Sequence, residues 1–167
     1  MSASFLLGID LGTTTCRAAL FDLDGHQLAV AYSETAVQYP RPDRAEVDPE
    51  AWWSGAVRVV RRVIDDSEVA PNLIASVGLS GLMHAPVLLY GDGKPVTPAM
   101  LWMDQRCAPQ CEALKRAYAS LGRAPEFGVT TGVSAPKLRW LAEEQPETLA
   151  RARMFMLPKD FLRYRMT

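Results

Sequence analysis

Short apolar runs separated by tight turns open the chain. Residues 5–9 and 17–21 are mostly apolar and strand-sized, and Asp24-Gly25 separates the second run from a third at residues 28–31. Apolar runs of this length between turn residues are typical of buried β-strands. The start of the chain therefore predicts a three-stranded β-meander.

The hydrophobic pattern then changes to a helical period. The polar loop "PRPDRAEVDPE" ends in Asp48, Pro49 and Glu50, which suit the cap and first turn of a helix. The spacing that follows predicts a helix with one apolar face packed on the sheet. The apolar residues at this spacing are Trp52, Ala56, Val59, Val60 and Val63.

Strand and helix patterns alternate in the rest of the chain. Residues 73–79 predict a strand, residues 87–90 a hairpin arm before "GDGKP", and residues 155–157 a strand that leads into a short helix from Pro158. Two helices are predicted between these strands, and the resulting order is that of a mixed α/β protein. The first carries Cys111, Leu114, Tyr118 and Leu121, and the second is capped by Ser134 and carries Leu138 and Leu141.

The last residues, "KDFLRYRMT", have the pattern of an amphipathic helix. They include no glycine cap and no polar tail, which are common signals for the end of a helix. We therefore expect the 167 residues to be part of a longer chain.

Composition and charge narrow the classes of function. The chain has 167 residues, 49% of them hydrophobic, so a single domain with a substantial core is the default expectation. Its 18 basic residues against 19 acidic ones give no global field that would attract nucleic acid or an anionic membrane. We find no membrane-length apolar run and no basic region before the first apolar stretch, which predicts a cytoplasmic location.

The three cysteines indicate reduced thiols more than a disulfide framework. The cysteines are Cys16, Cys107 and Cys111, an odd number, and the last two are four residues apart, close enough on one helix face to share a metal. A shared metal would need further ligands, and the chain has two histidines in all. We interpret the cysteines as packing residues, with metal binding as the alternative.

The stretch "GIDLGTTTCRAALFD" combines residue types that suit a phosphate site. Gly12 permits close backbone approach, the amides of residues 12–14 and the hydroxyls of Thr13 and Thr14 are donors, and Arg17 adds positive charge. Asp10, at the end of the predicted strand, could face hydrated Mg²⁺. The alternative is an ordinary turn in which the polar side chains bond only to the backbone.

The same stretch resembles the first phosphate loop of the actin-like ATPase superfamily. Further along, "VGLSGLMHAPVLLYGDGKPVTPAMLWMDQRC", "SAPKLRWL" and "LPKDFLRYRMT" resemble the FGGY carbohydrate kinases, most closely their xylulokinase branch. The resemblance implies a ribonuclease H-like, actin-like ATPase domain with a mixed sheet. It also implies that residues 1–167 are the truncated amino-terminal domain of a two-domain kinase.

The resemblance further implies an ATP-dependent, Mg²⁺-dependent kinase that acts on a small sugar. On the nucleotide side it assigns Asp10 to the metal through water, and Gly12, Thr13, Thr14 and Arg17 to the phosphates. A sugar needs polar groups for its hydroxyls and an apolar surface for its C–H face. The residues that the resemblance places at the sugar are Met83, His84, Trp102, Asp104 and Arg106. The alternative for His84 and Trp102 is an ordinary role in the core.

The sequence departs from the xylulokinase pattern beside the sugar residues. Leu82 stands where a glutamine is usual, Ala85 where a glycine is usual, and Met103 and Gln105 where an asparagine and a small residue are common. These changes affect the polarity near the acceptor. D-Xylulose is therefore the first expected substrate, and a gluconokinase-like or another FGGY sugar or polyol kinase activity is the alternative.

The catalytic aspartate of these kinases lies in a later Gly-Gly-x-Asp segment, outside the 167 residues. We therefore expect no phosphorylation by these residues alone, because phosphoryl transfer needs a complete, closed cleft. Two functions of other classes remain as alternatives: an Hsp70-like ATP-driven binding protein, and a sugar-binding relative without catalysis. The resemblance also makes a homodimer an expected possibility, but the sequence does not identify an interface for it.

Overall fold

The computed structural model describes residues 4–124 and 128–167, which form two compact units. Residues 4–36, 50–82 and 158–167 make up unit 1. Residues 37–49, 83–124 and 128–157 make up unit 2, whose segments alternate in the sequence with the three parts of unit 1. Each unit is described by itself.

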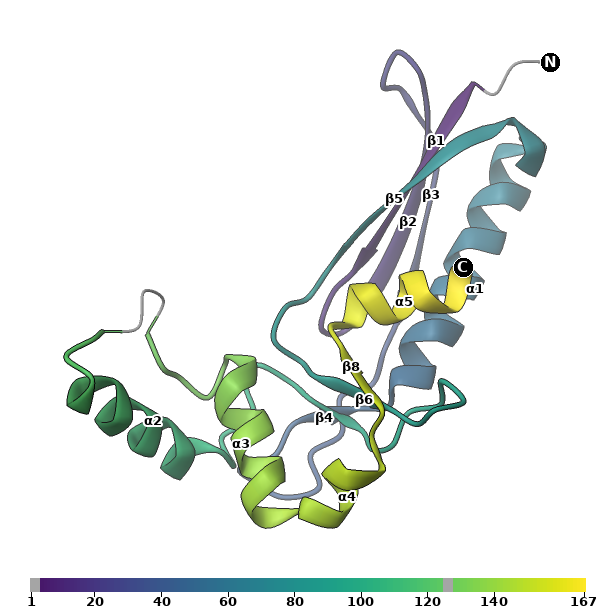
Figure 1. Ribbon diagram of the computed structural model, residues 1–167. Helices are drawn as coiled ribbons and strands as arrows, with labels where there is room; N and C mark the ends of the chain where they lie inside the picture. The colour runs from purple at the N-terminus through teal and green to yellow at the C-terminus, as the bar shows by residue number, and fades with distance from the viewer. Residues whose placement is uncertain (1–3, 125–127) are drawn as a thin grey trace. The chain divides into compact units, whose positions relative to one another are not determined.

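Unit 1 is built on a four-stranded mixed sheet in the order β3-β2-β1-β5 (Figure 1). The first three strands are antiparallel neighbours, which confirms the predicted meander, and β5 pairs parallel to β1. Each strand is longer than its apolar run because flanking polar residues continue the ladder. The strands are β1 (Phe5–Leu11), β2 (Thr15–Asp22), β3 (Gln27–Glu34) and β5 (Ile74–Gly81).

Helix α1 (Pro49–Ser67) packs against one face of this sheet. Side chains alternate along a strand, and Leu7, Ile9 and Leu11 of β1 are buried while Asp10 between them is exposed. The predicted helical face of α1 is also confirmed. Its buried residues include Trp52, Ala56, Val59 and Val63.

Helix α5 (Pro158–Met166) completes unit 1 and begins at the predicted proline. Arg165 near its end forms an ion pair with Glu50 of α1, and its guanidinium lies 4.8 Å from the centroid of the Trp53 ring. These contacts join α5 to α1. Between α1 and β5 the chain makes one short 3₁₀ turn, η1 (Pro71–Leu73).

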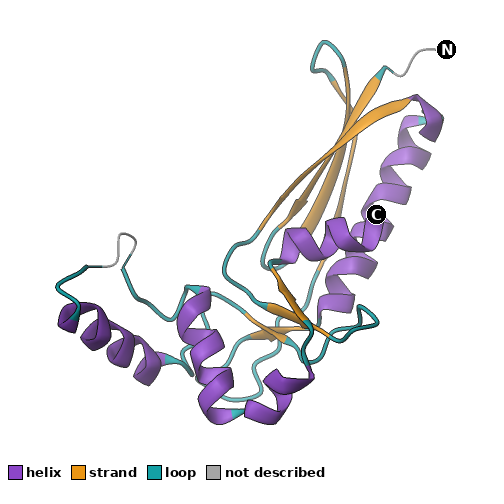
Figure 2. Ribbon diagram, viewed as in Figure 1, coloured by secondary structure: helices purple, strands orange, loops and turns teal. Residues whose placement is uncertain are grey.

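Unit 2 combines three helices with two short two-stranded ladders (Figure 2). A cluster in its core contains five buried side chains from two strands, a loop and a helix: Leu88, Met100, Cys107, Trp140 and Leu141. The helices are α2 (Ala108–Ser120), α3 (Ser134–Glu144) and α4 (Pro146–Arg151). The ladders pair β4 (Glu46–Val47) with β7 (Ala99–Met100), and β6 (Val87–Leu89) with β8 (Met154–Met156).

Three local predictions differ from the structure of unit 2. The chain does turn back after β6, with a bridge between Leu89 and Pro95, but the ladder partner of β6 is the distant β8. Ser134 is the first residue of α3 and not its cap, and its Oγ has no hydrogen-bond partner among the described residues. Leu121 follows the end of α2 and is 71% exposed. Each outcome depends on packing that a local pattern does not contain.

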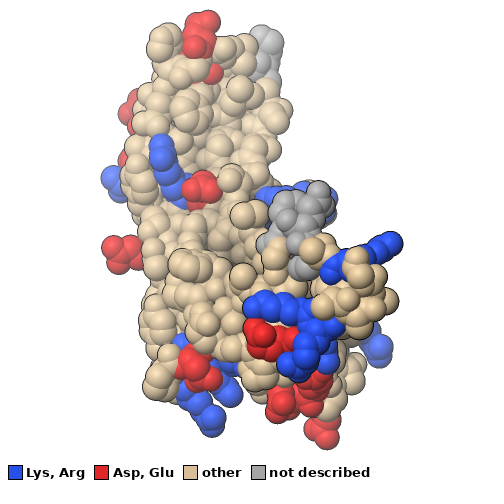
Figure 3. Space-filling view, turned by 90° about the vertical axis from the view of Figure 1, so that its left-hand side faces the viewer, with Lys and Arg blue, Asp and Glu red and all other residues tan. Residues whose placement is uncertain are grey.

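The surface shows the charge balance of the sequence. On the face drawn in Figure 3, acidic and basic side chains lie interspersed, as the nearly equal totals predict. Among the described residues, no helix is long and apolar enough to cross a membrane.

Candidate functional site

The turn between β1 and β2 leaves little room for a side chain at position 12. The amide of Gly12 donates a hydrogen bond of 2.9 Å to the carbonyl oxygen of Thr15. A Cβ at position 12 would lie 3.0 Å from that same oxygen, closer than side chains normally approach. The prediction that the Gly12 amide faces a phosphate is therefore wrong, because the turn itself uses that donor. Gly12 shapes the loop that presents Thr13 and Thr14.

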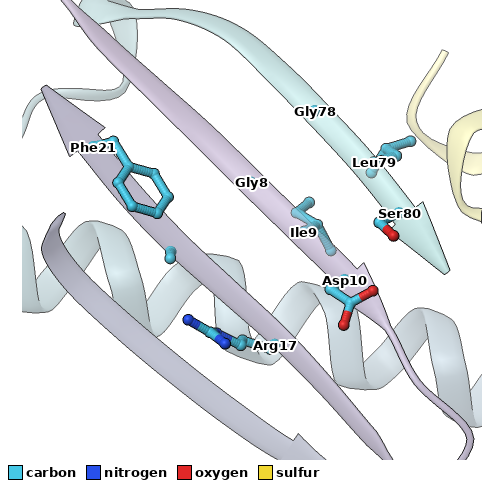
Figure 4. A pocket seen from close by; sticks show the side chains of 9 residues that line it. Gly8, Ile9, Asp10, Arg17, Phe21, Gly78, Leu79 and Ser80 are labelled. Carbon is cyan, nitrogen blue, oxygen red and sulfur yellow. The ribbon is translucent and has the colours of Figure 1, made fainter. Parts of the chain in front are cut away.

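A hollow of about 380 Å³ lies on the sheet face opposite α1 (Figure 4). The register places Asp10 of β1 between Arg17 of β2 and Ser80 of β5, so three polar side chains of different kinds come from adjacent strands. Gly8 and Gly78 lack side chains and leave the hollow open. The predicted neighbourhood of Asp10 and Arg17 is thus present in unit 1.

The hollow offers a carboxylate, a guanidinium and a hydroxyl at the end of β1. Asp10 is exposed, so its carboxylate is accessible to a hydrated cation. The Arg17 guanidinium lies 5.7 Å from the centroid of the Tyr32 ring on β3, a cation–π contact that restricts its position. These three groups suit a metal-bound phosphate. The carboxylate can face the metal, and the guanidinium and the hydroxyl on the same face can donate hydrogen bonds to phosphate oxygens.

The cysteines are buried packing residues. Burial raises the pKa of Cys16 to about 11, and the nearby Asp10 charge acts in the same direction. Burial likewise raises the pKa of Cys107 to about 11. Thiols with such pKa values are unreactive near neutral pH. Among the described residues, neither Cys107 nor Cys111 belongs to a group of three metal-ligand side chains, which agrees with packing.

In unit 2, His84 occupies an unusual backbone conformation beside a pocket of about 480 Å³. Its φ is +61°, in the left-handed region that residues other than glycine rarely adopt and that often marks functional sites. The carbonyl oxygen of His84 accepts a 2.6 Å hydrogen bond from Nζ of Lys137. The described pocket lining includes His84, Leu114, Tyr118, Val129, Val133 and Pro136.

Met83 and Trp102 are large apolar side chains at the surface of unit 2. Met83 is 65% exposed and Trp102 is 54% exposed. The next residue, Met103, accepts a contact from the hydroxyl of Tyr39 at 3.6 Å, which ties this loop to residues 37–49. With more than half of its surface exposed, Trp102 is not a core residue, contrary to the alternative considered for it.

Asp104 is fully buried and bonded on both carboxylate oxygens. Oδ1 accepts from the backbone amide and Nε of Arg106 at 3.1 and 2.8 Å. Oδ2 accepts from Nη2 of Arg106 at 2.7 Å and from the amide of Ala45 at 2.8 Å. A carboxylate has about four acceptor positions, so these four bonds leave none for a sugar hydroxyl. The predicted pairing of Asp104 with Arg106 is present, but the predicted direct contact with sugar is not supported.

Arg106 joins this carboxylate to a second one. Its Nη2 donates to Oε1 of Glu46 at 2.5 Å, and its guanidinium lies 5.2 Å from the centroid of the Trp140 ring. Burial disfavours the charge, but the hydrogen bonds to Asp104 and Glu46 outweigh burial and raise the pKa of Arg106 above its usual value. The network fixes the loop that carries Trp102 to the β4 strand.

Lys137 and Glu46 are the important residues that the sequence reasoning missed. Lys137 is fully buried on α3, three residues before Trp140. A lysine at a position that shares a helix face with Trp140 and Leu141 is unusual, and this spacing was the available signal. Glu46 has no comparable signal, because it meets Arg106 only through the fold.

The buried ammonium of Lys137 predicts that the free energy of unfolding depends on pH. Burial lowers the pKa of Lys137 from 10.5 to about 8. Between these values the unfolded chain binds more protons at this side chain than the folded chain, so the free energy of unfolding should rise with pH. We expect the stability of the wild type relative to the Lys137→Met variant to increase between about pH 8 and pH 10.

Denaturant unfolding of both proteins at a series of pH values measures this difference. Groups that titrate in both proteins cancel in the comparison. Parallel stability curves over that range would show that the Lys137 pKa is not lowered.

Comparison with known proteins agrees with this architecture. The family model described as "FGGY family of carbohydrate kinases, N-terminal domain" matches residues 5–167. Xylulose kinase of Escherichia coli strain K12 is 34% identical over 167 residues, covering 96% of this chain and 33% of that protein. Glycerol kinase of Thermococcus kodakarensis is 32% identical over 168 residues, covering 98% of this chain and 34% of that protein.

A solved structure matches the fold over nearly the whole chain. The crystal structure of a xyloylose kinase from Brucella ovis has a TM-score of 0.86 and 32% sequence identity, covering 95% of this chain and 33% of that one. The predicted actin-like ATPase class with a mixed sheet is confirmed. The chain spans about a third of the length of the relatives that it matches.

Proposed function

Because the chain belongs to the FGGY family of carbohydrate kinases, we propose that the protein transfers the γ-phosphoryl group of ATP to a hydroxyl of a sugar, with D-xylulose as the first acceptor. The family match over residues 5–167 carries this proposal. The similarity to E. coli xylulose kinase supports the choice of acceptor. A chaperone-like function receives no support from these comparisons.

On the nucleotide side, the exposed carboxylate of Asp10 would hold Mg²⁺ through its water ligands. Such an ion neutralises charge on the transferred phosphoryl group when it is bound. Thr13 and Thr14 would donate hydrogen bonds to phosphate oxygens, and Arg17 would add a fixed positive charge. Gly12 contributes the tight turn that positions both threonines.

On the acceptor side, we assign direct contacts to His84, Trp102 and Met83. The imidazole would exchange hydrogen bonds with sugar hydroxyls, and the exposed indole would cover the C–H face of the sugar. Asp104 and Arg106 would act indirectly, because their polar atoms hold the Trp102 loop in place.

A substrate panel on the full-length gene product tests the proposed reaction. D-Xylulose, ribulose, gluconate and glycerol are offered with Mg-ATP, and we expect the highest kcat/KM for D-xylulose. Turnover of gluconate alone or glycerol alone would reject the xylulose assignment and retain the kinase. The absence of phosphorylation for every acceptor would reject the kinase function itself and favour a non-catalytic sugar-binding protein.

The role of His84 predicts a selective kinetic defect. We expect His84→Ala in the full-length protein to raise the KM for the sugar about tenfold or more, because hydrogen bonds to its hydroxyls are lost. The KM for ATP should stay within about twofold. Steady-state kinetics with each substrate varied in turn provide both values.

The other histidine of the chain supplies the matched control. His26 lies exposed at the β2–β3 turn, where it pairs with Asp22, so His26→Ala should leave both KM values unchanged. Equal losses for sugar and ATP in His84→Ala would instead identify His84 as a structural residue.

A further inference from the structure

Lys137 is a buried charge that the proposed reaction does not use directly. It lies on α3 with a relative exposure of 0%, on the helix side that carries Trp140 and Leu141 of the core. Removing an ammonium from water is costly unless it gains strong polar partners. Among the described residues Lys137 forms no ion pair, so its partners must be of another kind.

Two backbone carbonyl oxygens accept hydrogen bonds from the Lys137 ammonium. Nζ donates to the carbonyl oxygen of His84 at 2.6 Å and to that of Gly132 at 3.3 Å. His84 and Gly132 are 48 positions apart in the sequence. One buried side chain therefore joins the His84 segment to the turn before α3.

A hydrogen bond to the His84 carbonyl strongly affects the backbone conformation of this residue. A left-handed φ of +61° costs roughly 1–2 kcal/mol for a residue with a Cβ, so other contacts must hold it. Without a donor at its carbonyl, the peptide after His84 can rotate toward a more favourable region. A change of φ at His84 would also change the direction of its Cα–Cβ bond, and with it the position of the imidazole of this pocket-lining residue.

The second carbonyl connects Lys137 with the loop that carries Trp102. The turn at residues 130–133 contacts this loop through Thr131, whose carbonyl accepts from Sγ of Cys107 at 3.8 Å and whose hydroxyl donates to Gln105 at 3.2 Å. A Cβ on Gly132 would lie 3.5 Å from the carbonyl oxygen of Trp102. Both segments with proposed sugar contacts therefore meet the partners of Lys137.

We propose that Lys137 is a positioning residue for sugar binding, which holds the His84 backbone in its left-handed conformation and joins it to the turn beside the Trp102 loop. This inference rests on the proposed function. Lys137 touches neither substrate; it acts through the two carbonyls. Its removal should impair recognition of the sugar and leave nucleotide binding intact.

The substitution Lys137→Met in the full-length protein tests this role, because methionine has similar length and no donor. With the panel acceptor that the wild type phosphorylates best, we expect the sugar KM to rise about tenfold or more, since a small misplacement of a binding group has large effects. The KM for ATP should stay within about twofold. Lys94→Met, at an exposed lysine of the same unit, is the matched control and should match the wild type.

The outcomes separate the two proposals. An inactive wild type overturns the proposed function before Lys137 is tested. An active wild type with an unchanged sugar KM in folded Lys137→Met, or with equal rises for sugar and ATP, overturns the positioning role. If Lys137→Met does not fold, Lys137→Gln retains donor hydrogens on a shorter side chain, and its sugar KM alone should rise. An unchanged sugar KM in folded Lys137→Gln would likewise overturn the role.

Discussion

Replacing Arg106 with methionine is expected to lower the free energy of unfolding of the full-length protein by about 3–5 kcal/mol. Arg106 supplies two of the four hydrogen bonds to the fully buried Asp104 through its side chain, and one to Glu46. Methionine preserves much of the apolar packing on Trp140 but leaves a buried carboxylate without its counter-charge. Urea unfolding followed by tryptophan fluorescence measures the change.

An exposed arginine in the same unit provides the comparison. Arg139 pairs with Glu143 at the surface of α3, and loss of such a pair is worth only about 0.3–0.5 kcal/mol. The Arg139→Met variant should therefore have nearly the same free energy of unfolding as the wild type. A similar small loss for Arg106→Met would mean that the buried network contributes little to stability.

The second large effect concerns activity. We expect Asp10→Asn to lower kcat by about 10²–10³, since one group that organises charge at the transferring phosphate is neutralised. The fold should persist, because Asp10 is exposed and asparagine has nearly the same shape. Initial rates at saturating sugar and Mg-ATP, with circular dichroism as a check of folding, provide the measurement.

Asp24→Asn is the matched control for the lost charge. Asp24 is an exposed aspartate at the β2–β3 turn of the same unit, away from the strand end that carries Asp10. Its replacement should leave kcat within about twofold of the wild type. If Asp10→Asn behaves in the same way, Asp10 has no role in phosphoryl transfer and belongs only to the turn.

The motifs in the sequence locate much of the candidate site, but they predict the roles of only some of its residues. The strand end with Asp10 and Arg17 could be predicted, because neighbouring strands of a meander place residues near the turn side by side. The role of Asp104 could not be predicted from the sequence. Its backbone partner Ala45 lies 59 positions earlier in the chain, and only that contact shows how the carboxylate is used.

The sequence by itself determined the elements whose signals are local. Short apolar runs between turn residues identified the meander, and helical periods identified α1 and α5, because these patterns lie within each element and do not depend on its partner. The motifs around Asp10, His84 and Trp102 identified the family, because they are short contiguous patterns.

The tertiary structure decided which polar groups face a ligand and which face the protein. Asp104, Arg106 and Lys137 are all polar in the sequence, yet burial and partners distant in the sequence, such as Ala45, Glu46 and His84, make them internal supports. Trp102 is apolar and yet exposed. A buried charge is tolerated only where specific partners satisfy it, and those partners come from segments far apart in the chain.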